Sequence, residues 1–101
     1  MQMTYQQQEA LHRAVRARIE EILTAHPLRD VETDYVAEIV LECHGAGGVT
    51  KQIPQAAAEY KWLLDFLEST SRISPAEHKA LYRLYTLGIS DIIMEVAQND
   101  F

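Results

Sequence analysis

The residues of this chain that are best suited to chemistry lie together at positions 42–51, which read ECHGAGGVTK. A cysteine and a histidine beside three glycines and a lysine suggest a phosphate cradle, a metal or thiol site, or a flexible joint. A phosphate-binding P-loop needs a glycine before its lysine and a strand before the loop. Here Thr50 precedes Lys51, and the preceding segment has a helical pattern. What remains is a generic anion site, in which Thr50 and Lys51 act with free N–H groups at a helix start. The alternative is a glycine cap followed by a hinge.

The single cysteine does not predict a catalytic or metal site. Cys43 lies on an apolar stripe near the end of a predicted helix, where the helix dipole disfavours a thiolate, so we expect a buried structural thiol. One Cys with an adjacent His lacks the spacing of a zinc finger, and the other histidines are scattered along the chain. The sequence also lacks G-x-S-x-G, H-E-x-x-H and paired-cysteine patterns. We therefore expect no metal site, no cofactor and no enzymatic activity.

Composition and charge describe one small acidic domain spanning residues 1–101. Hydrophobic residues make up 48% of the chain, and there are only 4 glycines and 3 prolines, which favours a folded, helical protein. The formal net charge of −6 argues against direct binding to nucleic acid or to an anionic membrane and favours a basic partner protein. Neither a signal peptide nor an apolar run long enough to span a bilayer is present, so we expect a cytoplasmic location.

Hydrophobic periodicity predicts an all-α fold, a compact bundle of about five helices. Capping boxes at Thr4 and Ser74 mark two helix starts, Thr33 or Asp30 is expected to cap another, and Gly88 is expected to end one. The predicted helices cover residues 5–26, 33–44, 51–70, 75–87 and 90–98. In the first of these helices, the apolar residues with helical spacing form one stripe: Leu11, Val15, Ile19, Ile22 and Leu23.

The final two of these segments carry a partial resemblance to a known motif. Within residues 80–98, the run LGISDIIMEV resembles the turn and supporting helix of a helix-turn-helix. That resemblance implies DNA binding, but this sequence departs from the motif in two ways. The recognition helix would begin near Asn99, two residues before the last, and no Lys or Arg follows Arg83. We therefore expect a plain helical hairpin here and no DNA binding.

An acidic stretch is the first surface on which function could depend. Five acids and no base occur over residues 30–42, and they form a predicted acidic ridge: Asp30, Glu32, Asp34, Glu38 and Glu42. Like charges four residues apart repel weakly on a solvated helix face, so simple solvation is one interpretation. Neutralisation by Arg13, Arg16 and Arg18 is a second. The functional interpretation is that the ridge meets a basic groove on another protein.

The segment 51–70 has two apolar faces. Tyr60, Leu63, Leu64 and Leu67 form the expected core stripe. A second stripe, Ala58, Trp62 and Phe66, lies on nearly the opposite side. A helix with two apolar faces is either sandwiched in its own bundle or facing a partner, and exposed aromatic residues make good interface anchors. The sequence leaves both readings open, and homodimerisation is the simplest form of the second.

Three functional hypotheses follow. The first is a small intracellular antagonist that occludes a larger basic protein, a partner that itself could bind nucleic acid, in the manner of immunity proteins or phage inhibitors of host defence. The second is a homo-oligomeric structural or assembly-chaperone protein that uses the second stripe. The third is a small-ligand domain centred on the glycine-rich joint at Thr50 and Lys51.

Overall fold

The computed structural model describes residues 4–43 and 53–98. Within these ranges the protein is helical and contains no strand. The elements are α1 (Tyr5–Ile22), α2 (Asp30–Glu42), α3 (Ile53–Ser69), α4 (Pro75–Arg83), the π-helical turn η1 (Leu84–Gly88) and α5 (Ile89–Gln98). Because α4, η1 and α5 follow one another without a break, they form one bent helix, and the described residues make four helices rather than five. None of them combines the length and the apolar content needed to cross a bilayer.

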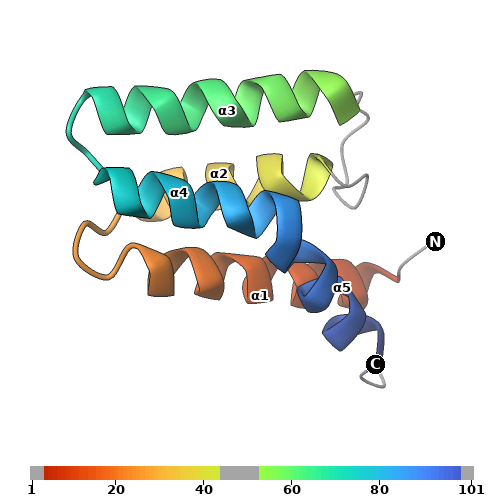
Figure 1. The fold of residues 1–101 in the computed structure, drawn as a ribbon. Coiled ribbons are helices and arrows are strands. Elements are labelled where there is room, and N and C mark those ends of the chain that lie inside the picture. Colours follow the sequence, from red (N-terminus) through yellow and green to blue (C-terminus); the bar gives the residue numbers. More distant parts are fainter. Residues whose placement is uncertain (1–3, 44–52, 99–101) are drawn as a thin grey trace.

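The four helices form a bundle in which consecutive helices run in opposite directions (Figure 1). In this view α3 lies along the top and α1 along the bottom, with α2 and α4 between them. Helix α2 packs against both α1 and α3, and α4 packs against α3 and α1. At its end the bent helix turns toward α1, so that α5 also contacts α1 (Figure 1). The predicted helical bundle is confirmed.

The core consists of the apolar stripes that the sequence predicts. In the predicted stripe of the first helix, four side chains are buried: Leu11, Val15, Ile19 and Leu23. On α3, Tyr60 and Leu64 are fully buried, and the Tyr60 hydroxyl donates a hydrogen bond to the Leu81 carbonyl oxygen at 2.7 Å. Burial raises the pKa of that hydroxyl above its ordinary value, which keeps it neutral and able to donate.

Local sequence signals set the starts of α1 and α4. Both predicted capping boxes are present, with the Thr4 and Ser74 side chains accepting from backbone N–H groups three residues on. The predicted cap of α2 is wrong, because α2 begins at Asp30 with Arg29 as the capping residue. Thr33 instead is buried inside the helix, where its hydroxyl donates to the Arg29 carbonyl oxygen. Helix α1 ends at Ile22, four residues earlier than predicted.

The bend at residues 84–88 overturns the predicted helix end at Gly88 and the predicted helical hairpin. The Ile89 N–H donates a hydrogen bond to the Leu84 carbonyl oxygen, five residues back. This turn therefore holds one more residue than an α-helical turn, and the helix continues beyond it. This extra residue lets Ile89, Ile92 and Val96 all be buried in the core. Burial of these three side chains stabilises the continued helix by more than the ~1 kcal/mol by which a single glycine destabilises it.

A Schellman motif ends α3 and directs the chain into α4. The N–H groups of Ser71 and Arg72 bond to the carbonyl oxygens of Glu68 and Leu67, and Ser71 lies in the left-handed region with φ of 60°. Ser71 is the only non-glycine residue in the described ranges with positive φ. Glycine enters this conformation without the steric cost that a Cβ imposes, so the sequence carries a local strain at this turn.

Replacing Ser71 with glycine should therefore stabilise the protein. We expect Ser71→Gly to raise the free energy of unfolding by about 0.5–1 kcal/mol, the relief of left-handed strain less the entropy of glycine in the unfolded chain. Urea denaturation measures it. The control is Ser69→Gly, the same substitution within the last turn of α3, which should stabilise nothing. Equal effects of the two substitutions would contradict the assignment of strain to Ser71.

Candidate functional site

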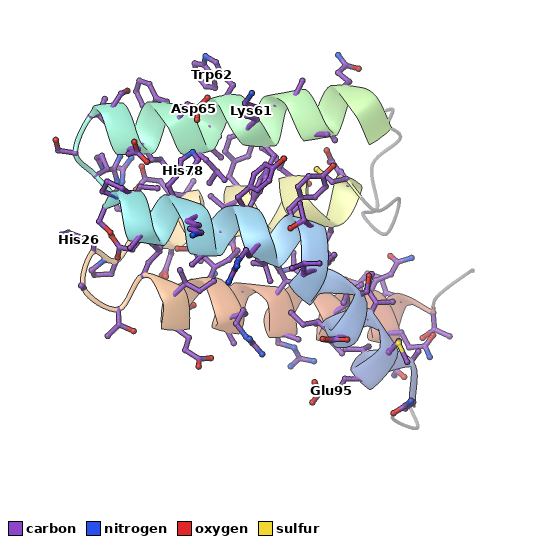
Figure 2. All side chains as sticks on the ribbon, in the orientation of Figure 1. His26, Lys61, Trp62, Asp65, His78 and Glu95 are labelled. Atoms are coloured by element: carbon purple, nitrogen blue, oxygen red, sulfur yellow. The ribbon has the colours of Figure 1, made fainter. Side chains whose placement is uncertain are left out.

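The second apolar stripe of α3 faces solvent. Trp62 is 64% exposed, Phe66 is 46% exposed and Ala58 is exposed. The Trp62 and Phe66 rings are stacked, with centroids 5.5 Å apart and planes 14° from parallel. Figure 2 shows Trp62 on the outer side of α3, pointing away from the other helices. We call Ala58, Trp62 and Phe66 the aromatic ridge.

The position of α3 in the bundle explains this exposure. Residues 58, 62 and 66 lie four apart and share one helix face, while Tyr60, Leu64 and Leu67 occupy the opposite face and are buried. Helix α3 packs on α2 and α4, both of which lie on its inner side (Figure 1). The sequence was compatible both with burial of the second stripe between helices and with its exposure. The arrangement of the helices in the bundle leaves it exposed.

Charged side chains border the aromatic ridge on one side. Asp65 lies 2.9 Å from the Nε2 atom of His78 on α4, and Glu68 lies 4.0 Å from Nδ1 of the same ring. Figure 2 shows Asp65 and His78 facing each other, with Lys61 nearby on α3. The Asp65 and Glu68 side chains stay 58% and 41% exposed. The border thus carries two carboxylates and one exposed ammonium group that a partner can reach.

The predicted acidic ridge is not one continuous exposed surface. Arg16 of α1 bonds to Asp30 and to Asp34, each at 2.5 Å, and also to Glu20 at 2.9 Å. These contacts raise the pKa of the Arg16 guanidinium above its ordinary value, with the Glu20 hydrogen bond as the largest cause. Of the N-terminal arginines that were expected to pair with the ridge, Arg16 does so, and its single positive charge is shared among three carboxylates.

The other three members of the acidic ridge have three different environments. Arg72 donates two hydrogen bonds to Glu32, at 2.7 and 2.8 Å, across 40 positions of sequence. Glu42 is buried, at 4% exposure, which corrects its assignment to the exposed ridge, because the surrounding structure covers this last residue of α2. Glu38 is exposed and keeps the surface location that the prediction requires.

The glycine-rich joint lies largely outside the described residues, and so do Thr50 and Lys51. Cys43, at its edge, is 5% exposed. Burial, followed by the charge of Glu42, raises the pKa of its thiol to about 11, so the thiol is neutral and poorly nucleophilic at pH 7. The predicted buried thiol is confirmed. In the described ranges, no group of three or more His, Cys, Asp or Glu side chains could hold a metal ion.

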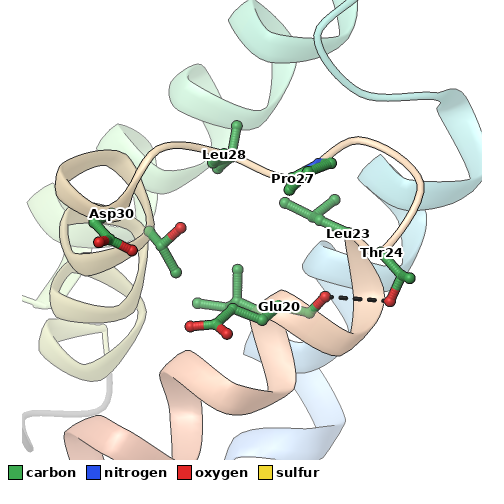
Figure 3. A pocket seen from close by; sticks show the side chains of 8 residues that line it. Glu20, Leu23, Thr24, Pro27, Leu28 and Asp30 are labelled. Carbon is green, nitrogen blue, oxygen red and sulfur yellow. Dashed lines mark hydrogen bonds between the residues drawn. The ribbon is translucent and has the colours of Figure 1, made fainter.

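A hollow of about 270 Å³ lies at the turn between α1 and α2 (Figure 3). Leu23, Pro27 and Leu28 form apolar walls, and Glu20 and Asp30 supply carboxylates. Both carboxylates already bind Arg16, whose single positive charge is also shared with Asp34. Because they belong to the protein's own ion pairs, we assign no ligand to this hollow.

A larger hollow, of about 360 Å³, was missed by the sequence analysis. It lies between α1 and the bent helix and is lined by Arg18, Ile22, Leu84, Leu87 and Asp91, among others. The sequence signal was Leu87, an apolar residue beside Gly88 that belongs to no predicted stripe. Leu87 points to a hollow only once the π-turn is known, and hydrophobic periodicity does not predict a π-turn.

Comparisons of this chain with protein-family models, with curated proteins and with solved structures found no match. Function is therefore inferred from the surfaces described above.

The Glu32–Arg72 ion pair predicts a specific pH dependence of stability. Hydrogen bonds from Arg72, then from the Arg29 backbone, lower the pKa of the Glu32 carboxyl from 4.5 to about 2. Because the folded-state pKa lies below the unfolded value, this pair stabilises the protein above about pH 4.5 and ceases to do so as the pH falls to about 2.

We expect Arg72→Gln to reduce the free energy of unfolding at pH 7 by about 1 kcal/mol, a modest value because Arg72 is partly exposed. The loss should shrink as the pH falls from 4.5 toward 2. Urea denaturation at a series of pH values measures both effects. Arg13→Gln, which removes the same charge from a residue with no ion pair in the described ranges, is the control. Parallel pH curves for wild type and Arg72→Gln would contradict this role of Glu32.

Proposed function

We propose that this protein acts by binding another protein through the aromatic ridge of α3. The observation that carries the proposal is the stacked pair of Trp62 and Phe66, whose side chains remain 64% and 46% exposed. Trp is the residue most typical of the energetic centre of an interface. Isolated exposed apolar side chains are ordinary on proteins, but two stacked aromatic rings on one helix face form a patch.

Burial energetics support a binding role for this pair. Full burial of a large apolar side chain stabilises a complex by about 1.5–3 kcal/mol, and stacking fixes both rings before the partner arrives. Less rotamer entropy is then lost on binding. A rigid aromatic pair on a regular helix is a preorganised anchor.

The border of the aromatic ridge specifies the chemistry of the partner. Asp65 and Glu68 place two carboxylates beside the rings, with Lys61 nearby. A complementary partner presents an apolar hollow edged mainly by Lys or Arg. The net charge of −6 steers such a basic partner toward the protein before contact.

In the form of the proposal that we favour, the protein is a non-enzymatic antagonist that occludes a functional surface of a larger basic protein. The single free thiol of Cys43 suits a reducing compartment such as the cytoplasm. The second form is a homo-oligomeric assembly protein. It is favoured by the same observation, because an exposed apolar ridge can also be covered by another copy of the chain.

Truncating the aromatic ridge tests the proposal directly. The tagged protein is used to capture its partner from extracts of the native host, and affinity for that purified partner is then measured by calorimetry. We expect Trp62→Ala to weaken binding at least about tenfold, as a central interface aromatic does. Tyr5→Ala removes a 74% exposed aromatic from α1 and should change nothing. Equal affinity of wild type and Trp62→Ala would exclude the aromatic ridge as the binding surface.

Glu38 tests the remaining part of the acidic ridge. If this exposed carboxylate steers a basic partner, Glu38→Lys should slow association and reduce its dependence on salt, while dissociation changes little. Stopped-flow kinetics at two ionic strengths separate the two rates. Glu95→Lys is the comparison, because it makes the same charge reversal at an exposed carboxylate on α5, outside the acidic ridge. An association rate unaffected by Glu38→Lys would exclude this carboxylate from the steering of the partner.

A further inference from the structure

The hollow between α1 and the bent helix has an apolar floor. Leu84 is buried, Ile22 is half-buried, and Leu87 stands at the rim with 69% of its surface exposed. The hollow has a volume of about 360 Å³, which lies in the lower part of the range of about 300–1,000 Å³ that is typical of ligand pockets. An open apolar hollow of this size can receive one or two aromatic rings.

The π-turn shapes this hollow. By inserting one residue, η1 directs Ile89 into the core, where it is fully buried, and leaves Leu87 outside. The bend also brings α5 against α1. Single π-turns occur frequently at functional sites, and here the turn exposes the apolar rim.

The rim of the hollow carries more positive than negative charge. Arg83 is exposed and forms no ion pair within the described residues. Arg18 is 53% exposed and has only a distant contact, 3.8 Å, with Glu21. Asp91 adds one exposed carboxylate. Two available guanidinium groups around an apolar floor are unusual on a chain of net charge −6.

This hollow matches the partner chemistry that the aromatic ridge requires. The ridge presents stacked rings bordered by two carboxylates and a lysine, and the hollow presents an apolar floor bordered by two arginines and an aspartate. We propose, on the basis of the function proposed above, that the aromatic ridge of one copy docks into this hollow on a second copy. Asp65 and Glu68 then meet the arginine rim, and Lys61 has Asp91 as an available counterion.

The placement of the two surfaces makes the contact head-to-tail. Helix α3 and helix α1 lie on opposite sides of the bundle (Figure 1), and no residue of α3 lines the hollow. A ridge-to-hollow contact is therefore heterologous, so each added copy leaves one ridge and one hollow exposed. The contact covers the ridge, so a foreign partner competes with the second copy for Trp62.

Trp62 is the only tryptophan of the chain, so its fluorescence reports on the ridge directly. Sedimentation velocity and emission spectra are recorded over a wide range of protein concentration. We expect reversible association of the wild type, with Trp62 emission moving to shorter wavelength as its ring leaves water. High salt should weaken the association, because the rim contacts are ionic.

A mixing experiment tests the head-to-tail geometry. Trp62→Ala removes the ridge and keeps the hollow, whereas Leu87→Glu puts a charge into the hollow and keeps the ridge. Each variant alone should stay monomeric. Mixed, they should form a one-to-one heterodimer, because each supplies the surface that the other lacks. Only Leu87→Glu contains a tryptophan, so a blue shift on adding Trp62→Ala reports that its ridge is buried. Both altered side chains are exposed, and circular dichroism confirms the fold.

Arg83→Glu tests the charged rim. This substitution should lower the association constant of the two copies at least tenfold. The control is Arg13→Glu, an equal charge reversal on an exposed arginine outside the hollow. It should leave the association constant within twofold of the wild-type value.

Two outcomes would overturn the ridge-to-hollow contact. Wild type that stays monomeric at every soluble concentration excludes it, as does a Leu87→Glu variant that associates like the wild type, which would mean ridge-to-ridge pairing. Neither outcome affects the proposed function, provided that Trp62→Ala still weakens capture of a foreign partner. If Trp62→Ala changes neither self-association nor partner capture, the proposed function itself fails.

Discussion

The structure depends on burial of the broad apolar face of α2. Val36, Ala37, Ile39 and Val40 are all at most 1% exposed, a burial wider than one stripe, so helices must cover α2 on more than one side. Helix α1 packs on one side and α3 on the other. This places α1 and α3 at opposite edges of the bundle. The outer face of α3 is then left to solvent, and α1 is left to form a hollow with the bent helix. Both proposed binding surfaces follow from the central position of α2.

Ion pairs redistribute the charge that composition alone describes. The formal charge of −6 suggests an evenly acidic protein, yet Arg16 and Arg72 bind three of the five carboxylates over residues 30–42. These contacts hold α1 and the α3–α4 connection against α2. The charges that border the two proposed binding surfaces lie elsewhere: Asp65 and Glu68 beside the aromatic ridge, and Arg18 and Arg83 around the hollow. Local pairing, more than net charge, therefore sets which surfaces attract which partners.

The two proposed binding surfaces together suggest how a small protein can regulate its own availability. An exposed tryptophan is a liability for unspecific association, and a complementary hollow on the next copy would shield it at high concentration. Dilution or a tighter partner would then release the ridge. In this arrangement the antagonist and assembly hypotheses describe two bound states of the aromatic ridge. Which state forms depends on the relative affinities of the second copy and of the foreign partner for Trp62.

The sequence alone predicted the helices, both capping boxes, the core stripes of α1 and α3 and the buried thiol of Cys43, because these depend on contacts within a few residues of each other. Gly88 was misread for a related reason: its local preference for ending a helix was outweighed by burial of Ile89, Ile92 and Val96 against the rest of the bundle. Only the tertiary structure decided that Trp62 and Phe66 face solvent, that Glu42 is buried, and that Glu32 meets Arg72 across 40 positions. Periodicity shows that a helix has an apolar face, but whether another helix covers that face depends on how all four are arranged in space.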